Sequence, residues 1–174
     1  MSLFSVDCEF DGPAPGLYSM ISFAIVRIDE DLQTSFKGLV APISENFRPE
    51  VHTLLKITRE EHLSYMSPAV VMPEAMRFVI ENTKGRAVCI GDNPAGDWQF
   101  LNYYFHRFCG ENPFGNSARR IGDFYAGLRG DFKTSIEWKK LRTTPHNHDP
   151  LNDARGNAEA FKKIIETYGL KKPW

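Results

Sequence analysis

Hydrophobic and polar residues follow regular patterns in the first quarter of the chain, and these patterns predict three β-strands. Residues 3–10 alternate, so that apolar side chains occupy one face while Asp7 and Glu9 occupy the other. Residues 20–28 form an almost continuous apolar run, as expected of a strand that is covered on both faces. Residues 34–43 form a third candidate strand. We expect these three strands to pair antiparallel.

The remainder of the chain changes to helical spacing. Thr58-Arg59-Glu60-Glu61 matches a capping box and predicts a short helix after Thr58. The longer helices that we predict from apolar spacing and from flanking Pro or Gly residues cover residues 73–84, 94–108 and 150–168. Two short strands are predicted at residues 86–90 and 120–124. Strands followed by a strand–helix alternation predict an α/β fold, with a mixed central sheet flanked by helices in one domain over residues 1–174.

The composition is ordinary and agrees with this fold class. A chain of 174 residues with 42% hydrophobic residues is long enough to bury one core. A formal net charge of −1 argues against a protein that coats nucleic acid through overall positive charge, but it allows an acidic pocket with local basic patches. Three widely spaced cysteines predict reduced thiols and a cytoplasmic protein, and no apolar run reaches the roughly 20 residues that cross a membrane.

Two carboxylates stand near the end of the first predicted strand. Asp7 and Glu9 are two residues apart, so their side chains project from the same face, roughly 6–7 Å apart along the strand. An arbitrary Asp-x-Glu pair is most often a solvated strand face. Acids at the end of an otherwise apolar strand are harder to explain in this way, and these two are close enough to bind a common cation.

Two further acids share one position relative to a helix start. Asn93 and Asp149 are each followed by proline, a pattern that predicts an N-cap before the first helical residue. Asp97 and Asp153 each lie four residues after that cap, in the first turn, where the helix dipole favours an ionised carboxylate. That preference alone makes acids common in first turns. Crowded carboxylates, however, need cations to neutralise them, so convergence of all four acids would create a metal site.

His148 precedes the predicted cap at Asp149 and therefore belongs to a loop. A neutral imidazole takes up a proton from water near neutral pH, as an attack on phosphorus requires. A surface histidine in a polar stretch is the plainer interpretation, and His146 competes for the same role. The spacing between His148 and Asp153 favours His148.

The order of these residues resembles the DEDDh 3′→5′ exonucleases, a family that includes ribonuclease T, oligoribonuclease and bacterial proofreading subunits. Its three motifs are matched, in chain order, by Asp7 and Glu9, by Asn93 and Asp97, and by His148 and Asp153. The resemblance spans almost the whole chain and implies a ribonuclease H-like fold. It also implies that the four acids bind two divalent cations, Mg²⁺ or Mn²⁺, and that the histidine assists hydrolysis. Asp123 resembles an acid that the family often carries after the second motif, so Asn93 and Asp123 would support the site.

The chain departs from the family pattern at positions that border the substrate. Phe10 stands where the family often has Thr, and Leu55-Lys56 stands where many members have His-Gly before Ile-Thr. The Phe10 ring is suited either to stacking on a terminal base or to packing in the core. Neither departure removes a metal ligand. Several basic residues are candidates for contact with substrate phosphates; the alternative is that they are ordinary solvated surface residues. These candidates are Lys56, Lys139, Lys140, Arg142 and Arg155.

The predicted function is therefore metal-dependent 3′→5′ hydrolysis of single-stranded or short nucleic acid, with release of nucleoside 5′-monophosphates and with RNA ahead of DNA. The expected partner is RNA or DNA with a free 3′ end, no membrane is involved, and resemblance alone implies a homodimer. Two alternatives stay open: a catalytically silent nucleic-acid-binding module of the same fold, and a metal-dependent phosphohydrolase of small nucleotides. The sequence contains no GxxxxGK phosphate loop that would favour the second alternative.

Overall fold

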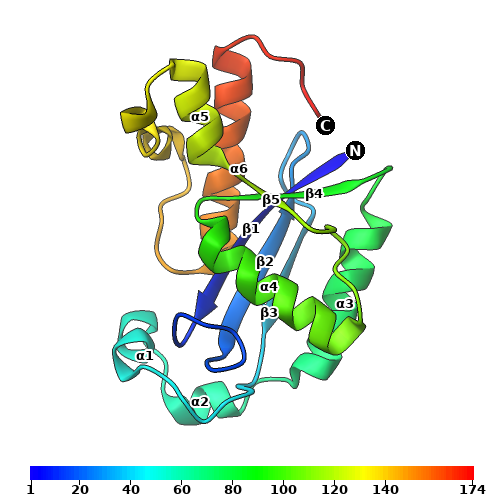
Figure 1. Ribbon diagram of the computed structural model, residues 1–174, viewed down its shortest axis with the longest axis vertical. Coiled ribbons are helices and arrows are strands. Elements are labelled where there is room, and N and C mark those ends of the chain that lie inside the picture. Colours follow the sequence, from blue (N-terminus) through cyan, green and yellow to red (C-terminus); the bar gives the residue numbers. More distant parts are fainter.

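A five-stranded mixed sheet runs through the centre of the protein, in a computed structural model that describes residues 1–174 (Figure 1). The strand order is β3-β2-β1-β4-β5. Strands β1, β2 and β3 pair antiparallel, as predicted, and β4 and β5 continue the sheet in parallel with β1. The strands span Ser2–Phe10 (β1), Met20–Arg27 (β2), Ser35–Leu39 (β3), Ala87–Gly91 (β4) and Ala118–Arg120 (β5).

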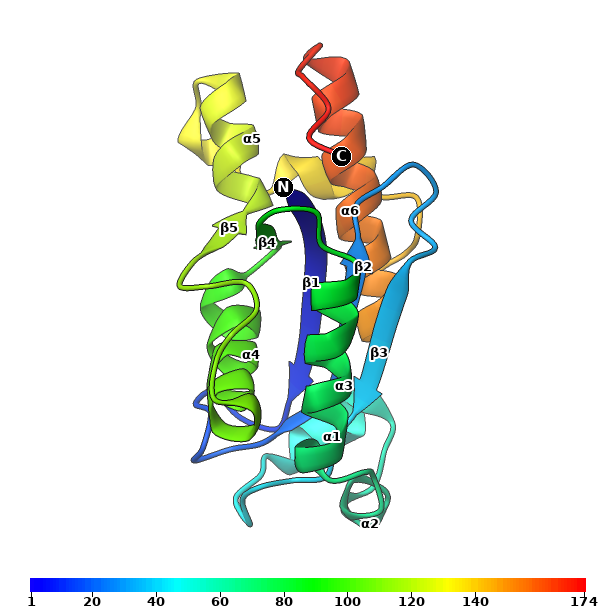
Figure 2. The same ribbon diagram turned by 90° about the vertical axis from the view of Figure 1, so that its right-hand side faces the viewer.

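Helices cover both faces of this sheet. Helices α3 and α4 pack on one face and α6 packs on the other, so that α4 and α6 lie on opposite sides of β1 (Figure 2). No helix has the combination of length and apolar character that crossing a membrane requires. The helices span Pro49–Leu55 (α1), Arg59–Leu63 (α2), Pro68–Glu81 (α3), Pro94–Cys109 (α4), Ile121–Arg129 (α5) and Pro150–Thr167 (α6), with 3₁₀ turns at Phe132–Thr134 and Glu137–Leu141.

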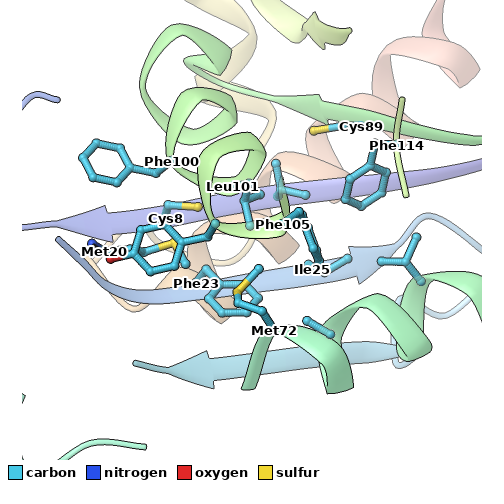
Figure 3. Packing of buried hydrophobic residues seen from close by; sticks show 14 of the residues in the cluster. Cys8, Met20, Phe23, Ile25, Met72, Cys89, Phe100, Leu101, Phe105 and Phe114 are labelled. Atoms are coloured by element: carbon cyan, nitrogen blue, oxygen red, sulfur yellow. Dashed lines mark hydrogen bonds between the residues drawn. The ribbon is translucent and has the colours of Figure 1, made fainter. Parts of the chain in front are cut away.

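The alternation of β1 divides the core between the two faces. Phe4, Val6 and Cys8 pack with α3 and α4, in the cluster drawn in Figure 3, whereas Leu3 packs in the second cluster with α6. Side chains of a strand alternate between its faces, so the other odd-numbered residues of β1 share the side of Leu3. The predicted alternation therefore sets the acidic positions of β1 on the α6 side of the sheet.

Several predicted boundaries were wrong, and local contacts explain why. Helix α3 begins at Pro68, five residues before the predicted start, because the Ser67 side chain caps it by accepting a hydrogen bond from the Ala69 N–H. The helix then continues through Pro73 with the loss of one backbone hydrogen bond. It ends at Glu81, because the side chain of Asn82 donates to a carbonyl of the last turn.

The strand predicted at residues 120–124 is also wrong, because β5 ends at Arg120 and helix α5 begins at Ile121. Helix α1 was not predicted at all. By contrast, the Thr58 side chain accepts a hydrogen bond from the Glu61 N–H, so the cap predicted for the short helix α2 is confirmed.

Candidate active site

Three of the four predicted acids meet near the end of β1 and the start of α6. Carboxylate oxygens of Asp7, Glu9 and Asp153 lie within 4.8 Å of one another. Asp97 comes from the first turn of α4, across β1, and its Oδ1 accepts a hydrogen bond from the Cys8 N–H over 3.1 Å. Asp97 thus lies beside the group, because it is hydrogen-bonded to the backbone of Cys8, the residue that follows Asp7 in β1.

Helices α4 and α6, which carry Asp97 and Asp153 in their first turns, differ in how their N-termini are capped. Asp149 caps α6 as predicted, since its Oδ1 accepts from the N–H groups of Leu151 and Asn152. Asn93 occupies the corresponding position of α4, but its side chain makes no capping hydrogen bond. Both first-turn acids are nevertheless buried, with Asp97 7% exposed and Asp153 1% exposed. Each is therefore held on a rigid helix turn with little access to water.

Burial and mutual repulsion leave these carboxylates poorly neutralised by the protein. Burial raises the pKa of Asp7 well above its usual range, and the nearby carboxylates of the site raise it further. Burial also raises the pKa of Glu9 to about 8 and that of Asp97 to about 7. No lysine or arginine forms an ion pair with these acids, and the Arg142 guanidinium offsets only part of the rise in the pKa of Asp7. Such a crowded set of oxygen donors fits a hard divalent cation such as Mg²⁺ or Mn²⁺.

Two histidines border the acids. His146 Nδ1 lies 2.7 Å from Asp153 Oδ2, whereas His148 Nδ1 lies 3.6 Å from Glu9 Oε1. Their rings contact each other edge to face, with centroids 4.7 Å apart. The competition seen in the sequence therefore persists in the structure: His146 has the shorter contact with an acid, and His148 faces the acid pair of β1.

The Phe10 ring is half-buried and packs against the core cluster that includes α4. It stacks on Phe100, with centroids 4.3 Å apart and an interplanar angle of 5°. The ring edge lies against Gly96, where an added Cβ would come within 3.2 Å of it. The core interpretation of Phe10 is therefore the one that the packing favours, since Phe100 covers one face of the ring.

The basic candidates differ in how far the protein already uses them. The Arg142 guanidinium is buried, lies 3.3 Å from Asp92 Oδ2 and covers the Trp138 ring, so it is not free for substrate. Lys139 also pairs with Asp92. Lys56 is exposed and forms no ion pair; it ends α1 in a left-handed conformation with φ 57°, where a glycine would be unstrained.

The remaining candidates do not join the acids. Asp123 pairs with Arg120 on the exposed side of α5 and forms no hydrogen bond with the acid group. Asn93 is exposed, and its backbone carbonyl accepts the N–H of Asp97. Arg155 is half-buried on α6, and its Nε has no hydrogen-bond partner. None of these three contributes a ligand atom to the group.

Sequence reasoning missed Lys37, which borders the same region. A cleft of about 270 Å³ beside His148 is lined by Lys37, Tyr65, Ile57 and neighbouring residues. Lys37 Nζ lies 2.7 Å from Asp149 Oδ2, although the two residues are 112 positions apart. A lysine on a short edge strand resembles any solvated residue, and no local pattern in the sequence indicates a partner so distant.

Comparison with known proteins places this geometry among nucleases. No family model matches the chain. An Escherichia coli protein named 3′-5′ DNA exonuclease Cap18 is 34% identical over 182 residues, which cover 97% of this chain and 94% of that protein. The crystal structure of cell-death related nuclease 4 superimposes with a TM-score of 0.74 at 16% identity, and covers 95% of this chain and 64% of its own.

A second solved structure carries a metal ion and a nucleic acid. The zinc-bound complex of E. coli exonuclease I with single-stranded DNA superimposes with a TM-score of 0.68 at 17% identity, over 95% of this chain and 40% of its own. This chain therefore spans less than two thirds of the length of either structure. At these identities the likeness concerns the fold, and it confirms the predicted ribonuclease H-like arrangement.

Proposed function

The chain belongs to the DEDDh-type 3′→5′ exonuclease family, and on that premise we propose that it removes nucleoside 5′-monophosphates from the 3′ end of single-stranded nucleic acid. The observation that carries the proposal is the meeting of Asp7, Glu9 and Asp153 near the C-terminal end of the central strand β1. A nucleic-acid-binding module that does not cut would have no need of this arrangement, because crowded buried carboxylates oppose folding unless cations bind them.

The proposed ligands of two divalent cations are Asp7, Glu9 and Asp153, with Asp97 beside them. Cations bound there would neutralise the carboxylates and polarise the oxygens of the scissile phosphate. The raised pKa values of Glu9 and Asp97 support this assignment, because burial and neighbouring carboxylates both disfavour the ionised forms there. Mg²⁺ and Mn²⁺ are the ions that an all-oxygen donor set favours.

We assign the proton transfer to His148. Its ring is half exposed beside Glu9, so a neutral imidazole there can reach a water that attacks the phosphate and can accept its proton. His146 is less suited to this role, because its Nδ1 is already engaged by Asp153 over 2.7 Å. Replacement of each histidine separately tests the choice between them.

The cleft beside His148 is the proposed site of the terminal nucleotide. Its apolar wall includes Leu39, Leu55 and Ile57, and such a wall can accept a base or sugar face. Lys56 stands between two of these residues as an exposed cation without an ion pair, so it is our candidate for a phosphate contact. A strong fall in activity with added salt would support such contacts.

Single-stranded DNA is the proposed first substrate. The sequence led us to expect RNA ahead of DNA, but the relative that aligns over almost the whole chain is named a DNA exonuclease. Discrimination between the two depends on contacts to the 2′-OH of the sugar. RNA therefore remains the substrate with which DNA must be compared.

The test is digestion of a 5′-labelled DNA oligonucleotide and its RNA counterpart with Mg²⁺, with Mn²⁺ or with EDTA. We expect a ladder that shortens from the 3′ end, faster on DNA and abolished by EDTA. Binding without shortening would identify a silent module. Hydrolysis confined to nucleotide monoesters would identify a small-molecule phosphohydrolase, and either result would overturn the proposal.

A further inference from the structure

The segment that carries His148, residues 143–149, is held mainly by helix α6. Near its start, the Thr144 N–H donates to Glu159 Oε2 over 2.7 Å. Near its end, the His148 N–H donates to Asp153 Oδ2 over 3.1 Å. Both acceptors belong to α6, so the helix fixes the segment along one side only.

The backbone at His148 needs more support than an ordinary loop residue. Its φ of 61° lies in the left-handed region, which side-chain-bearing residues adopt only where surrounding contacts enforce it. The ring itself is 38% exposed, and its 3.6 Å separation from Glu9 Oε1 is too long for a hydrogen bond. The position of the imidazole therefore depends on how firmly the backbone of the segment is held.

One contact to the segment comes from the sheet. Lys37 Nζ donates to Asp149 Oδ2 over 2.7 Å, while the other oxygen of Asp149 caps α6. Lys37 is the only residue outside the segment and α6 that forms a hydrogen bond with residues 143–149. The ion pair thus joins the edge strand β3 to the residue that directly follows His148.

The register of the sheet places this contact in line with the acids. Lys37 is paired with Ala24 across β3 and β2, and Ala24 is paired with Asp7 across β2 and β1. Directly paired residues project from the same face of a sheet, so Lys37 and Asp7 lie on the α6 side, two strands or roughly 10 Å apart. The sheet therefore provides a common frame for the acid pair and for the lysine that holds the histidine segment.

We propose that Lys37 is a positioning residue, whose ion pair with Asp149 holds residues 143–149 against the sheet so that His148 faces the acids. This inference rests on the proposed function, in which His148 accepts a proton. Asp153, the acceptor of the His148 N–H, is also a proposed cation ligand. The Lys37–Asp149 pair is therefore an anchor of the segment that does not share its atoms with the cation site.

The first test compares Lys37→Met with Lys37→Arg in steady-state digestion of single-stranded DNA. A misplaced imidazole should lower kcat by about tenfold with Lys37→Met, while KM stays within about twofold. Lys37→Arg keeps a cation within reach of Asp149 and should retain kcat within about threefold. Lys172→Met is the matched control, because it removes another exposed ion pair, to Glu166, and should change neither constant.

Lys37 also lines the cleft beside His148, so the same variants separate positioning from direct contact with substrate. A rise in KM at unchanged kcat would show that Lys37 binds substrate and would overturn the proposal. Combination with Asp149→Asn, which keeps a capping side chain but loses the charge, should produce no further loss beyond either single change. Additive losses would likewise overturn it.

The role of His148 in the effect is tested in a second background. Lys37→Met should lower kcat in the wild type but leave the residual kcat of His148→Ala unchanged, because there is no imidazole left to misplace. An equal loss in both backgrounds would assign Lys37 a general structural role and would contradict positioning.

Amide hydrogen exchange provides a readout that needs no nuclease activity. In the protein without substrate or added metal, Lys37→Met should speed exchange in residues 144–149 by at least about fivefold and leave the middle of α6 unchanged. Faster exchange in a protein that cuts no nucleic acid would sustain the anchor while the proposed function failed. Unchanged exchange in an active enzyme would refute the anchor alone.

Discussion

Asp11, His52 and His62 form a second group of possible metal ligands, away from the acids, and their ligand atoms lie within the same 4.8 Å as those of Asp7, Glu9 and Asp153. A third such group, His146, His148 and Asp153, shares Asp153 with the acids. The second group is completely enclosed and supplied with partners by the protein. Asp11 Oδ1 accepts the Ser19 N–H over 2.6 Å, and Asp11 Oδ2 lies 3.1 Å from Arg59 Nη1. No lysine or arginine forms an ion pair with Asp7 or Glu9 at the end of β1, and the Arg142 guanidinium only partly offsets the raised pKa of Asp7.

The Arg59 guanidinium is the feature that distinguishes the two groups. Its Nη1 also lies 3.3 Å from His62 Nδ1, so it occupies the space between the acid and the imidazole that an ion would need. Burial raises the pKa of Asp11, as it raises that of Glu9 to about 8, but Arg59 and the Ser19 N–H partly offset the rise at Asp11, whereas neighbouring carboxylates add to the rise at Glu9. Burial, reinforced by the same guanidinium, lowers the pKa of His62 to about 4. We infer that the Arg59 group is structural, and that a missing protein cation distinguishes a metal site from a buried ion pair.

The largest expected effect comes from Asp7→Asn. Loss of one ligand charge should lower exonuclease activity by at least about 10³-fold, because both cation binding and phosphate polarisation depend on the complete set. The free energy of unfolding should not fall, since the change relieves repulsion among buried carboxylates. Wild-type thermal stability should rise with Mn²⁺, and that of the variant should not. Full activity in the variant would show that the acids at the end of β1 are not a metal site, and the proposed difference from the Arg59 group would be wrong.

Histidine replacement gives the next effect. His148→Ala should slow hydrolysis by roughly 10²–10⁴-fold, because the attacking water loses its proton acceptor. The Mn²⁺-dependent rise in thermal stability should remain, because the acids are intact. His146→Ala is the matched comparison and should retain more activity. If His146→Ala proves the more damaging change, the base is His146 and the assignment from spacing is wrong.

Much of the framework could be predicted because it depends on local patterns. The alternation of β1 and the capped start of α6 are each encoded within a few neighbouring residues, and these two features bring Asp7 and Asp153 to one edge. The antiparallel order of the first three strands was likewise predictable. Helix α3 was misplaced because a proline inside a helix looks like the start of one.

Contacts between distant segments could not be predicted in the same way. The partner of Lys37 is 112 positions away, and Asp11 is joined to Arg59 across 48 positions. Arg142 looked like a free cation, yet the fold buries it against Asp92 and Trp138. Only the folded protein shows which charges are already neutralised by a partner. This difference distinguishes the Arg59 group from the acids at the end of β1.

The Arg59 group should respond to substitution in stability rather than in chemistry. Asp11→Asn leaves the buried guanidinium without its counter-charge, so the free energy of unfolding should fall by about 3 kcal/mol. Urea denaturation monitored by circular dichroism measures this change. Exonuclease activity per folded molecule should stay within a few-fold of the wild type at low temperature. A stability unchanged by Asp11→Asn, together with a lost response to Mn²⁺, would instead place a cation in this group.

The most gradual effect is a pH dependence of stability that has its source in His62. The imidazole is held neutral, because Nε2 donates to the Val40 carbonyl and the Arg59 guanidinium faces Nδ1. Burial lowers the pKa of His62 from 6.5 to about 4, so between these values the unfolded chain binds a proton that the folded chain does not. The free energy of unfolding should therefore fall on acidification across this window, by at most about 1.4 kcal/mol per pH unit.

The variant His62→Gln isolates this contribution, because glutamine can donate to the Val40 carbonyl but does not titrate. Glu9 and Asp97 act with the opposite sign in the metal-free protein, since their raised pKa values mean that the folded state takes up protons first as the pH falls. Those acids are present in both proteins and cancel in the difference. Wild type minus variant, measured by urea denaturation in EDTA, should be constant above pH 6.5 and should fall towards pH 4. A flat difference would mean that folding leaves the pKa of His62 unchanged, and that Arg59 does not set the charge of its group.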